Sequence, residues 1–366
     1  DKKELETLIT NGIESTRYLA VDESRMLADP ARYYKGGKPD LQLFDKKLYE
    51  VNPDDKVAIA RAAAEEVLGK DERIISVDSS YSDGEGSSYR LISNGFEGES
   101  KSTWFSVSAS VSIKGEGEAR PQDYWYDSAL FYDKLTKTGI GAKALERVLR
   151  KLGQKKAKSG KYTMVVDPMN VGNLLSPMLS ALYGSALQQK NSFLMDKLDT
   201  KVASDLFTLR DEPHAIGANG SRYFDNEGVA TEPRTVFDKG VLKTYFIDTY
   251  NGKKMDIAPT ISAPSRLILT PGDKDLNGLV ADIKQGILVT GFNGGNSNSS
   301  TGDFSYGIEG FLIEDGKLTQ PVNEMNVTGN MVTLWNSLVA VGNDPQPNRS
   351  WQIPSLVFEG VDFSGL

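Results

Sequence analysis

One short segment of the chain alternates strictly between apolar and hydroxyl side chains. Residues 105–113 read FSVSASVSI, which places the apolar side chains on one face of a β-strand and four serines on the other. Residues 72–81 and 88–93 are also rich in strand-forming residues, and Asn94-Gly95 is a strong hairpin signal. We therefore predict an antiparallel sheet with one polar face, which either meets solvent or lines a peptide channel.

Helical patterns surround this predicted sheet. Residues 4–20 and 138–153 carry apolar side chains at helical spacing, and Asn52-Pro53 is a typical start for a helix that ends near Gly69. The second half is mainly strand-like, over residues 162–166, 206–212, 235–247, 309–318 and 354–365, with helices predicted over 276–286 and 331–342. The predicted fold is α+β: an N-terminal helix-and-antiparallel-sheet domain (1–157), then a β-rich C-terminal domain with packed helices (158–366).

Two residue types that carry much enzyme chemistry are almost missing. The chain has no Cys and a single His, so disulfides, thiol catalysis and a closed Cys/His zinc site are excluded. Its net charge of −8 argues against direct contact with nucleic acid. No apolar run is long enough to span a bilayer. With no Cys, these features favour a cytoplasmic protein that binds neither nucleic acid nor membrane.

The single histidine, His214, lies in a segment that also holds carboxylates. Two interpretations remain open for His214, Asp225 and Glu227. They form a non-standard metal or hydrolase site, or they satisfy backbone donors at turns, as Asp commonly does.

Residues 291–307 read GFNGGNSNSSTGDFSYG and are rich in Gly, Asn and Ser. This composition predicts a loop between two strands, and it lacks the Gly-Lys-Ser/Thr ending of a phosphate-binding loop. The loop is either a flexible surface loop or a contact for a peptide or partner. In the second case we expect the contacts from Asn293, Asn296, Gly302, Asp303, Phe304 and Ser305, together with Gly184 of the helix described next.

Residues 176–190, SPMLSALYGSALQQK, predict a helix with a stripe of large side chains facing the core. A second stripe carries only small side chains, namely Ser176, Ser180, Ala181, Gly184 and Ser185. Small side chains let two backbones approach, so this stripe predicts close packing against another element.

Long runs of the second half resemble the TldD/PmbA family, the so-called modulators of DNA gyrase. The matching runs are SFLMDKL (192–198), VASDLFTLRDEP (202–213), YFDNEGVATEPRTVFDKGVLKTYFIDTY (223–250), TGDFSYGIEGFLIEDGKLTQPV (301–322), TGNMVTLWNSLVAVGNDP (328–345) and the PSLVFEGVDFSG ending. The first half matches more weakly, through residues 78–98. The comparison with the family implies that its opening α/β segment is missing before Asp1, so that this chain corresponds to part of a family protein.

The resemblance implies a specific departure from the family's chemistry. TldD-like members carry a His-Glu-x-x-x-His zinc motif on a helix, completed by a late Cys, with the Glu as general base. Aligned on the Gly-x-x-Leu pattern that follows, the motif positions are Ser180, Ala181 and Ser185 here, and the Cys is also missing. Gly184 keeps a residue suited to a helix break. The chain therefore looks like the PmbA/TldE branch, which is described as the partner of TldD in a two-component metallopeptidase.

Three functions follow as hypotheses. The first is a non-catalytic subunit that binds no metal itself, helps hold an extended peptide, and works as a homo- or heterodimer beside a TldD-like subunit that supplies zinc. The second is a self-sufficient hydrolase that uses His214, Asp225 and Glu227. The third is a regulatory protein that binds gyrase or DNA, against which the acidic charge argues.

Overall fold

Two very long strands organise the first half of the molecule. In the computed structural model, which describes residues 1–366, β1 (Ile74–Ile92) and β2 (Phe96–Ile113) pair antiparallel without interruption from Ser76 to Ile92. The turn at Asn94-Gly95 joins them, as predicted. The two strands predicted over 72–81 and 88–93 are therefore one strand. Gly84 and Gly86, which weaken a strand by propensity, are held in it by pairing with β2.

β3 (Gln122–Ala129) completes a three-stranded sheet by pairing with the last part of β2. The apolar face of residues 105–113 is buried against α2 (Pro53–Glu65) and α3 (Ile140–Leu149), which confirms the predicted alternation. Asn52 caps α2, because its side chain accepts a hydrogen bond from Asp55 N. The four serines lie on the opposite, partly exposed face.

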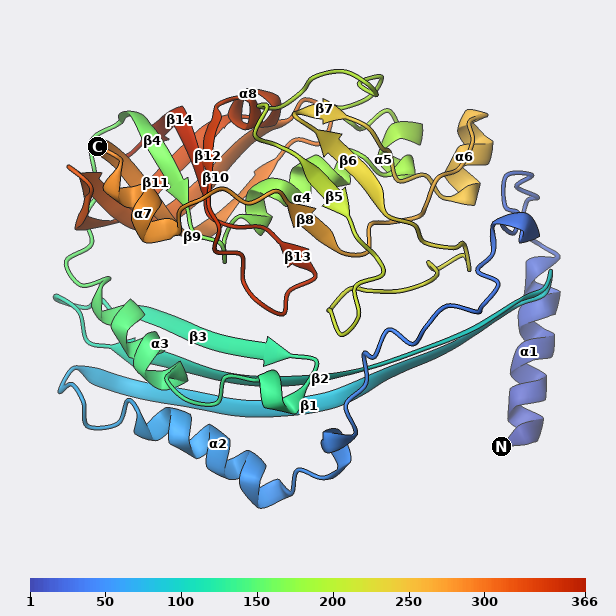
Figure 1. Ribbon diagram of the computed structural model, residues 1–366, viewed down its shortest axis with the longest axis horizontal. Coiled ribbons are helices and arrows are strands. Elements are labelled where there is room, and N and C mark those ends of the chain that lie inside the picture. The colour runs from blue at the N-terminus through green and yellow to red at the C-terminus, as the bar shows by residue number, and fades with distance from the viewer.

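The N-terminal segment runs along this hairpin to reach the sheet (Figure 1). Helix α1 (Lys2–Thr16) buries none of its residues and is followed by an irregular stretch with short 3₁₀ turns at Pro30–Arg32 and Lys46–Tyr49. No helix of the structure combines the length and the apolar character that crossing a lipid bilayer requires.

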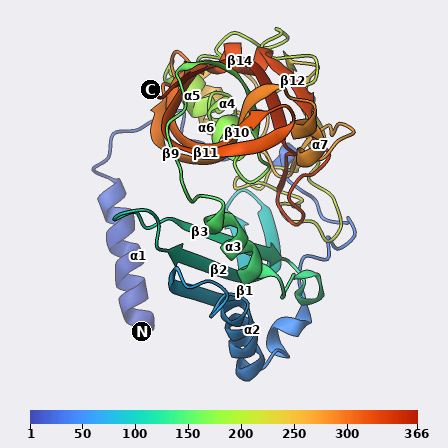
Figure 2. The same cartoon turned by 90° about the vertical axis from the view of Figure 1, so that its left-hand side faces the viewer.

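The second half is built around a sheet that closes on itself. Its strand order is β11-β10-β9-β4-β14-β12, and β11 also pairs with β14, so five of the strands form a ring. Figure 2 looks into this ring and shows α4 inside it. Leu174, Leu175 and Met178 of α4 are completely buried. The strands are β4 (Gly160–Val166), β9 (Gln285–Ser297), β10 (Asp303–Glu314), β11 (Lys317–Asn330), β12 (Leu338–Val341) and β14 (Leu356–Ser364).

A second sheet of short strands, in the order β13-β8-β5-β6-β7, flanks the ring. Its strands are β5 (Leu209–Asp211), β6 (Arg234–Asp238), β7 (Val241–Leu242), β8 (Leu267–Leu269) and β13 (Trp351–Gln352). The helices of this half are α4 (Gly172–Ser180), α5 (Gly184–Gln188), α6 (Thr249–Met255), α7 (Leu276–Ala281) and α8 (Met331–Asn336). The α+β class with a β-rich second half is as predicted.

Several predicted boundaries in this half are wrong. The helix predicted over 331–342 stops at Asn336, and residues 338–341 form β12 because they pair with β14 at the end of the sheet. The helix predicted over 276–286 stops at Ala281. Gly286 lies inside β9, where a Cβ atom would lie 2.6 Å from the Thr163 carbonyl oxygen of β4.

The loop predicted over 291–307 is also mostly strand. β9 runs to Ser297 and β10 starts at Asp303, which leaves a turn of residues 298–302. Gly, Asn and Ser have low strand propensity, but here the neighbouring strands of the ring impose the pairing. Gly295 lies so close to the paired strand β10 that a Cβ atom there would be 2.1 Å from the Ser305 carbonyl oxygen.

Candidate functional site

The segment that aligns with the family's metal motif is two short helices with a break between them. α4 ends at Ser180 and α5 begins at Gly184. Between them, Leu182 and Gly184 exchange backbone hydrogen bonds with Phe246, which prevents one continuous helix over 176–190. Gly184 packs directly on the start of α6, where a Cβ atom would lie 2.9 Å from Asn251 Cβ. The sequence predicted that the stripe of small side chains packs closely against another element, and Gly184 packs in this way against α6.

The motif positions do not offer a zinc site. Ser180 and Ser185 are exposed and Ala181 is buried, so two hydroxyls and a methyl group stand where the family has two imidazoles and a carboxylate. Nowhere in the chain do three or more His, Asp or Glu side chains gather in a group able to hold a metal ion. Hydroxyls are poor zinc ligands, so this donor set does not fit the metal.

The predicted contact residues of the β9–β10 hairpin divide between its surface and the core. Asn293, Asn296, Asp303 and Ser305 are exposed, whereas Gly302 and Phe304 are buried. The turn packs on the segment after α5, because Phe193 N donates to the Ser299 carbonyl oxygen and Ser300 Oγ to Asn191. Hydrogen bonds from Thr301 and Asn330 lower the pKa of Asp303. The hairpin tip and the end of α5 thus lie side by side.

His214, Asp225 and Glu227 each have other structural partners. His214 Nε2 lies 3.0 Å from Thr231 Oγ1, and burial lowers its pKa. Asp225 accepts hydrogen bonds from three backbone N–H groups, those of Glu227, Val229 and Ser262. Glu227 accepts from the N–H and hydroxyl of Thr249, and burial raises its pKa. These contacts match the turn-stabilising interpretation of the segment.

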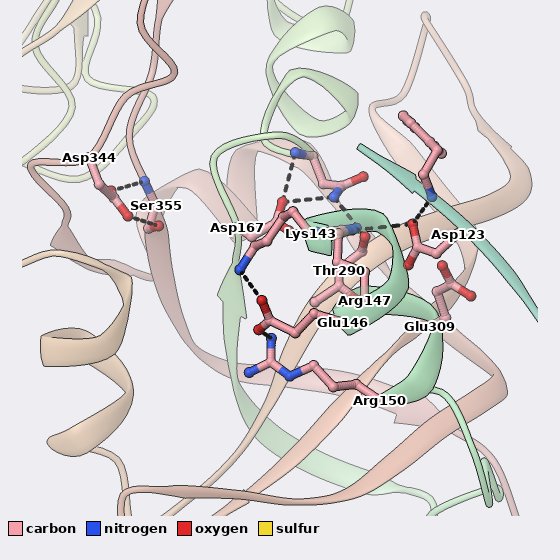
Figure 3. Close-up of polar contacts among 12 residues, drawn as sticks. Asp123, Lys143, Glu146, Arg147, Arg150, Asp167, Thr290, Glu309, Asp344 and Ser355 are labelled. Atoms are coloured by element: carbon pink, nitrogen blue, oxygen red, sulfur yellow. Dashed lines mark hydrogen bonds and ion pairs between the residues drawn. The ribbon is translucent and has the colours of Figure 1, made fainter. Parts of the chain in front are cut away.

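A cleft of about 660 Å³ lies where α3 meets the C-terminal half, and it is the clearest candidate binding site (Figure 3). One wall is α3, with Lys143, Glu146, Arg147 and Arg150. The other walls are the segment after β4, the start of α7 and the β10–β11 turn. Trp125 and Phe311 supply its aromatic surface, with the guanidinium groups of Arg147 and Arg150 over the two rings at 5.5 and 5.7 Å.

Largely buried ion pairs connect Arg147 and Asp167, which line this cleft, to charged residues beside it. Arg147 Nε donates to Asp123 Oδ1 at 3.2 Å, and its Nη1 lies 4.0 Å from Asp167 Oδ2. Lys151 pairs with Asp123 at 3.2 Å and with Glu309 of β10 at 2.7 Å. These five charged side chains are largely buried, so each charge depends on the others for stabilisation. At the mouth, Lys143 and Arg150 share Glu146 at 2.9 and 3.5 Å.

Asp167 is the one strongly perturbed acid in the cleft. It is 5% exposed, and Asn170 donates to its carboxylate through both the backbone and the side-chain N–H. Burial raises the pKa of Asp167 to about 6, against the opposing effect of Asn170 and Arg147. Asp344, which also lines the cleft, accepts hydrogen bonds from the backbone N–H groups of Leu276 and Ser355 and from the Ser355 hydroxyl.

This arrangement can bind and orient a polar ligand and can hold a proton on Asp167. The sequence analysis missed it. One available signal was the charged stripe at helical spacing over Lys143, Glu146, Arg147 and Arg150, and a second was Asp167 directly after an apolar strand. Arg147 pairs with Asp123 and lies 4.0 Å from Asp167, and both carboxylates come from distant parts of the chain, so no local pattern connects them.

Comparisons with known proteins agree with the resemblance seen in the sequence. The PmbA/TldA metallopeptidase C-terminal domain matches residues 159–365, and the central domain of the same family matches residues 46–152. The metalloprotease PmbA homologue of Haemophilus influenzae is 29% identical over 372 residues, covering 98% of this chain and 81% of that protein. A metalloprotease TldD homologue of Buchnera aphidicola matches 55% of this chain and 44% of its own length, at 25% identity.

Solved structures show the same fold. A crystal structure of a candidate modulator of DNA gyrase from Bacteroides thetaiotaomicron has 73% sequence identity and a TM-score of 0.99, covering 100% of this chain and 84% of that one. TldE from Thermococcus kodakarensis has a TM-score of 0.81 at 22% identity and covers 100% of this chain and 85% of its own. The chain therefore belongs to the PmbA/TldD metallopeptidase family.

Proposed function

We propose that this chain is a non-catalytic, PmbA/TldE-like subunit of a cytoplasmic metallopeptidase complex. A TldD-like subunit supplies the zinc, and this chain helps to hold an extended or unfolded peptide beside it. The observation that carries the proposal is the presence of Ser180, Ala181 and Ser185 at the positions of the family's metal ligands and base. Losing both imidazoles and the carboxylate together removes metal affinity and proton transfer.

The surroundings of these positions support a retained scaffold. α4 is still enclosed by the ring of strands, and α5 is still held on α6 by Gly184. Exposed Asn296 and Ser305 lie opposite each other on the β9–β10 hairpin, next to the segment after α5. Backbone and amide groups on such a hairpin suit an extended peptide, which binds largely through main-chain hydrogen bonds.

The test is to purify this chain, a TldD-like subunit from the same genome, and the two co-expressed together. We expect the mixture to cleave an unfolded peptide, this chain alone to be inactive, and zinc to be measured only in the TldD-like subunit. The matched control is a TldD-like subunit whose motif Glu is replaced by Gln, which should bind this chain and remain inactive.

Two results would contradict the proposal. Chelator-sensitive cleavage by this chain alone, lost in His214→Ala, would support a self-sufficient hydrolase. Salt-sensitive binding of this chain to DNA, without any association with the TldD-like subunit, would support a regulatory role.

A further inference from the structure

A second cavity, of about 400 Å³, lies between the long hairpin and the C-terminal half. Its walls are the segment 34–43 that leads to α2, Ser88 and Arg90 of β1, residues 99–101 of β2, and residues 221–226. Ser88, Arg90 and Ser100 belong to the serine face of the hairpin, so part of this face lines a cavity. Neither the β9–β10 hairpin nor the segment 176–190 contributes to it.

The β2 wall of this cavity has an open backbone edge. β3 pairs with β2 only over Phe105–Ser112, and before that the outer edge of β2 makes one backbone hydrogen bond, from Thr103 N to the Leu43 carbonyl oxygen. Backbone groups two residues apart in a strand point in the same direction, so the N–H and C=O groups of Glu99 and Lys101 also point to this unpaired side. A sheet edge of this kind can bind an extended peptide through main-chain hydrogen bonds.

Two cations at the cavity have no partner. Arg90 of β1 and Lys38 of the segment 34–43 form neither an ion pair nor a side-chain hydrogen bond. The Lys38 ammonium lies 5.3 Å from the centre of the Tyr223 ring, which stacks on Tyr34 with ring centroids 5.2 Å apart and planes inclined by 11°. The walls thus combine two unpaired cations with a flat aromatic surface.

The other charged side chains of the cavity walls are already engaged or point elsewhere. Lys101 forms an ion pair at 3.2 Å, and Arg222 donates to backbone carbonyl groups and a serine hydroxyl. Asp40 and Asp225 accept hydrogen bonds from backbone N–H groups. The side chain of Glu99 alternates with the serines and so lies on the other face of β2. The charge left without compensation is therefore that of the two unpaired cations.

We propose that this cavity binds an acidic segment of the extended peptide. The main chain of the peptide lies along the open edge of β2, and its carboxylates pair with Lys38 and Arg90. The assignment rests on the proposed function and adds the class of peptide that the chain holds. Carboxylates are favoured because they supply the negative charge that both cations lack, and because a guanidinium binds a carboxylate through two parallel N–H···O bonds. Asp and Glu side chains and the C-terminus of a peptide all carry this group.

The test measures binding of a fluorescein-labelled, unstructured peptide of about ten residues to the full chain by fluorescence anisotropy. One form of the peptide contains two Glu residues, a second has both replaced by Gln, and a third is the acidic form with an amidated C-terminus. We expect the acidic peptide to bind at least about tenfold more tightly than the Gln form, with the difference shrinking as salt is raised. A loss of affinity on amidation instead would assign the bound carboxylate to the C-terminus of the peptide.

Variants of the two cations locate the bound carboxylate. Lys38→Gln and Arg90→Gln should each reduce the preference for the acidic peptide at least about threefold and leave the affinity for the Gln form unchanged. Arg90→Lys keeps the positive charge and should keep most of the preference. Lys70→Gln, an exposed change after α2, should alter neither affinity. Amide exchange of residues 97–102 should slow when the acidic peptide binds, because the peptide pairs with this edge.

Circular dichroism identifies any variant that fails to fold, and the exposed position of Lys38 makes Lys38→Gln a variant that should fold like the wild type. Equal binding of the acidic and Gln forms by the wild type overturns the proposal, and so does the absence of any binding. A preference that both Lys38→Gln and Arg90→Gln leave intact overturns it as well. Failure of the proposed function is seen separately, as a mixture with the TldD-like subunit that cleaves no peptide of any charge.

Discussion

Asp167 is the residue in which burial, charge and position come together. It directly follows β4, it is nearly inaccessible to water, and its neighbours across the cleft are Arg147 of α3 and Asn170. Removing a carboxylate from water disfavours its charged form, and one guanidinium at 4.0 Å compensates only in part. The charge state of the cleft therefore changes near pH 6, within the range in which cells operate.

We predict that Asp167→Asn changes how stability depends on pH. The pKa in the folded protein, about 6, is above the ordinary 3.8, so the folded state binds the proton more tightly than the unfolded state. The stabilisation from Asp167 is complete below pH 4 and is lost as pH rises through 6. Stability of the wild type relative to Asp167→Asn should therefore fall by on the order of 3 kcal/mol over this range. Unfolding midpoints at pH 4, 5, 6 and 7 measure it.

The matched control for this experiment is Glu116→Gln, which removes an exposed carboxylate far from the cleft. Its unfolding midpoints should follow the wild type throughout. A difference between wild type and Asp167→Asn that stays constant from pH 4 to pH 7 would contradict the assignment.

At the scale of elements, the break between α4 and α5 shows how a stripe of small residues is used. Tyr183 forms a bridge with Phe246, and α5 then packs on α6 without space for a side chain at Gly184. The same segment contains Gly172 at the start of α4, where a Cβ atom would meet nothing within 4 Å. One helical segment therefore holds one glycine that packing requires and one that it does not.

We predict opposite effects for the same substitution at these two positions. Gly184→Ala pushes α5 away from Asn251 and Ile247 and should destabilise the protein by about 1–3 kcal/mol. Gly172→Ala reduces the freedom of the unfolded chain and should stabilise it by about 0.4–1 kcal/mol. Thermal unfolding of the two variants beside the wild type measures both. Equal destabilisation by the two substitutions would show that the packing at Gly184 is not the cause.

At the scale of the whole molecule, the first half contacts the C-terminal half at two places, one just after α3 and one at the tip of the long hairpin. Near α3, Lys151 reaches Glu309 of β10. At the tip, Phe96 is buried between Tyr33 and Phe224, with ring centroids 5.2 and 5.1 Å away, and packs on Gly228. The Asn94 amide donates to the Ala28 carbonyl oxygen beside it. The tip of the hairpin is therefore packed against the C-terminal half, and Figure 1 shows the hairpin running below that half along the length of the molecule.

We predict that Phe96→Ala weakens the packing of the hairpin tip against the C-terminal half. Loss of a fully buried phenyl ring should cost about 3–5 kcal/mol, and amide exchange should accelerate over residues 84–102 more than in β3. Glu99→Ala, an exposed change on the same hairpin, should alter stability by less than about 0.5 kcal/mol. Uniform acceleration across the protein would instead indicate that the tip and the sheet unfold as one unit.

Features that depend only on residues close together in the chain could be predicted from the sequence. Strict alternation over 105–113 predicted a strand with a buried apolar face, and Asn52-Pro53 and Asn94-Gly95 predicted a helix start and a hairpin turn. The missing Cys, the single His, and Ser180, Ala181 and Ser185 at the motif positions are also properties of the sequence alone. The long runs of matching residues indicated the family, and these missing groups led to the expectation of a PmbA/TldE-like chain whose partner holds the metal.

Features that depend on contacts between distant segments could be seen only in the three-dimensional structure. Residues 338–341 form a strand because β14 offers them an edge, and residues 291–297 extend β9 because β10 pairs with them. The break before Gly184 arises from Phe246, which no pattern within residues 176–190 indicates. The ion pairs of Arg147 and Lys151 bring together Asp123, Asp167 and Glu309 from separate parts of the chain. Local propensity differs by about 1 kcal/mol or less per residue, so pairing and packing with distant segments override it.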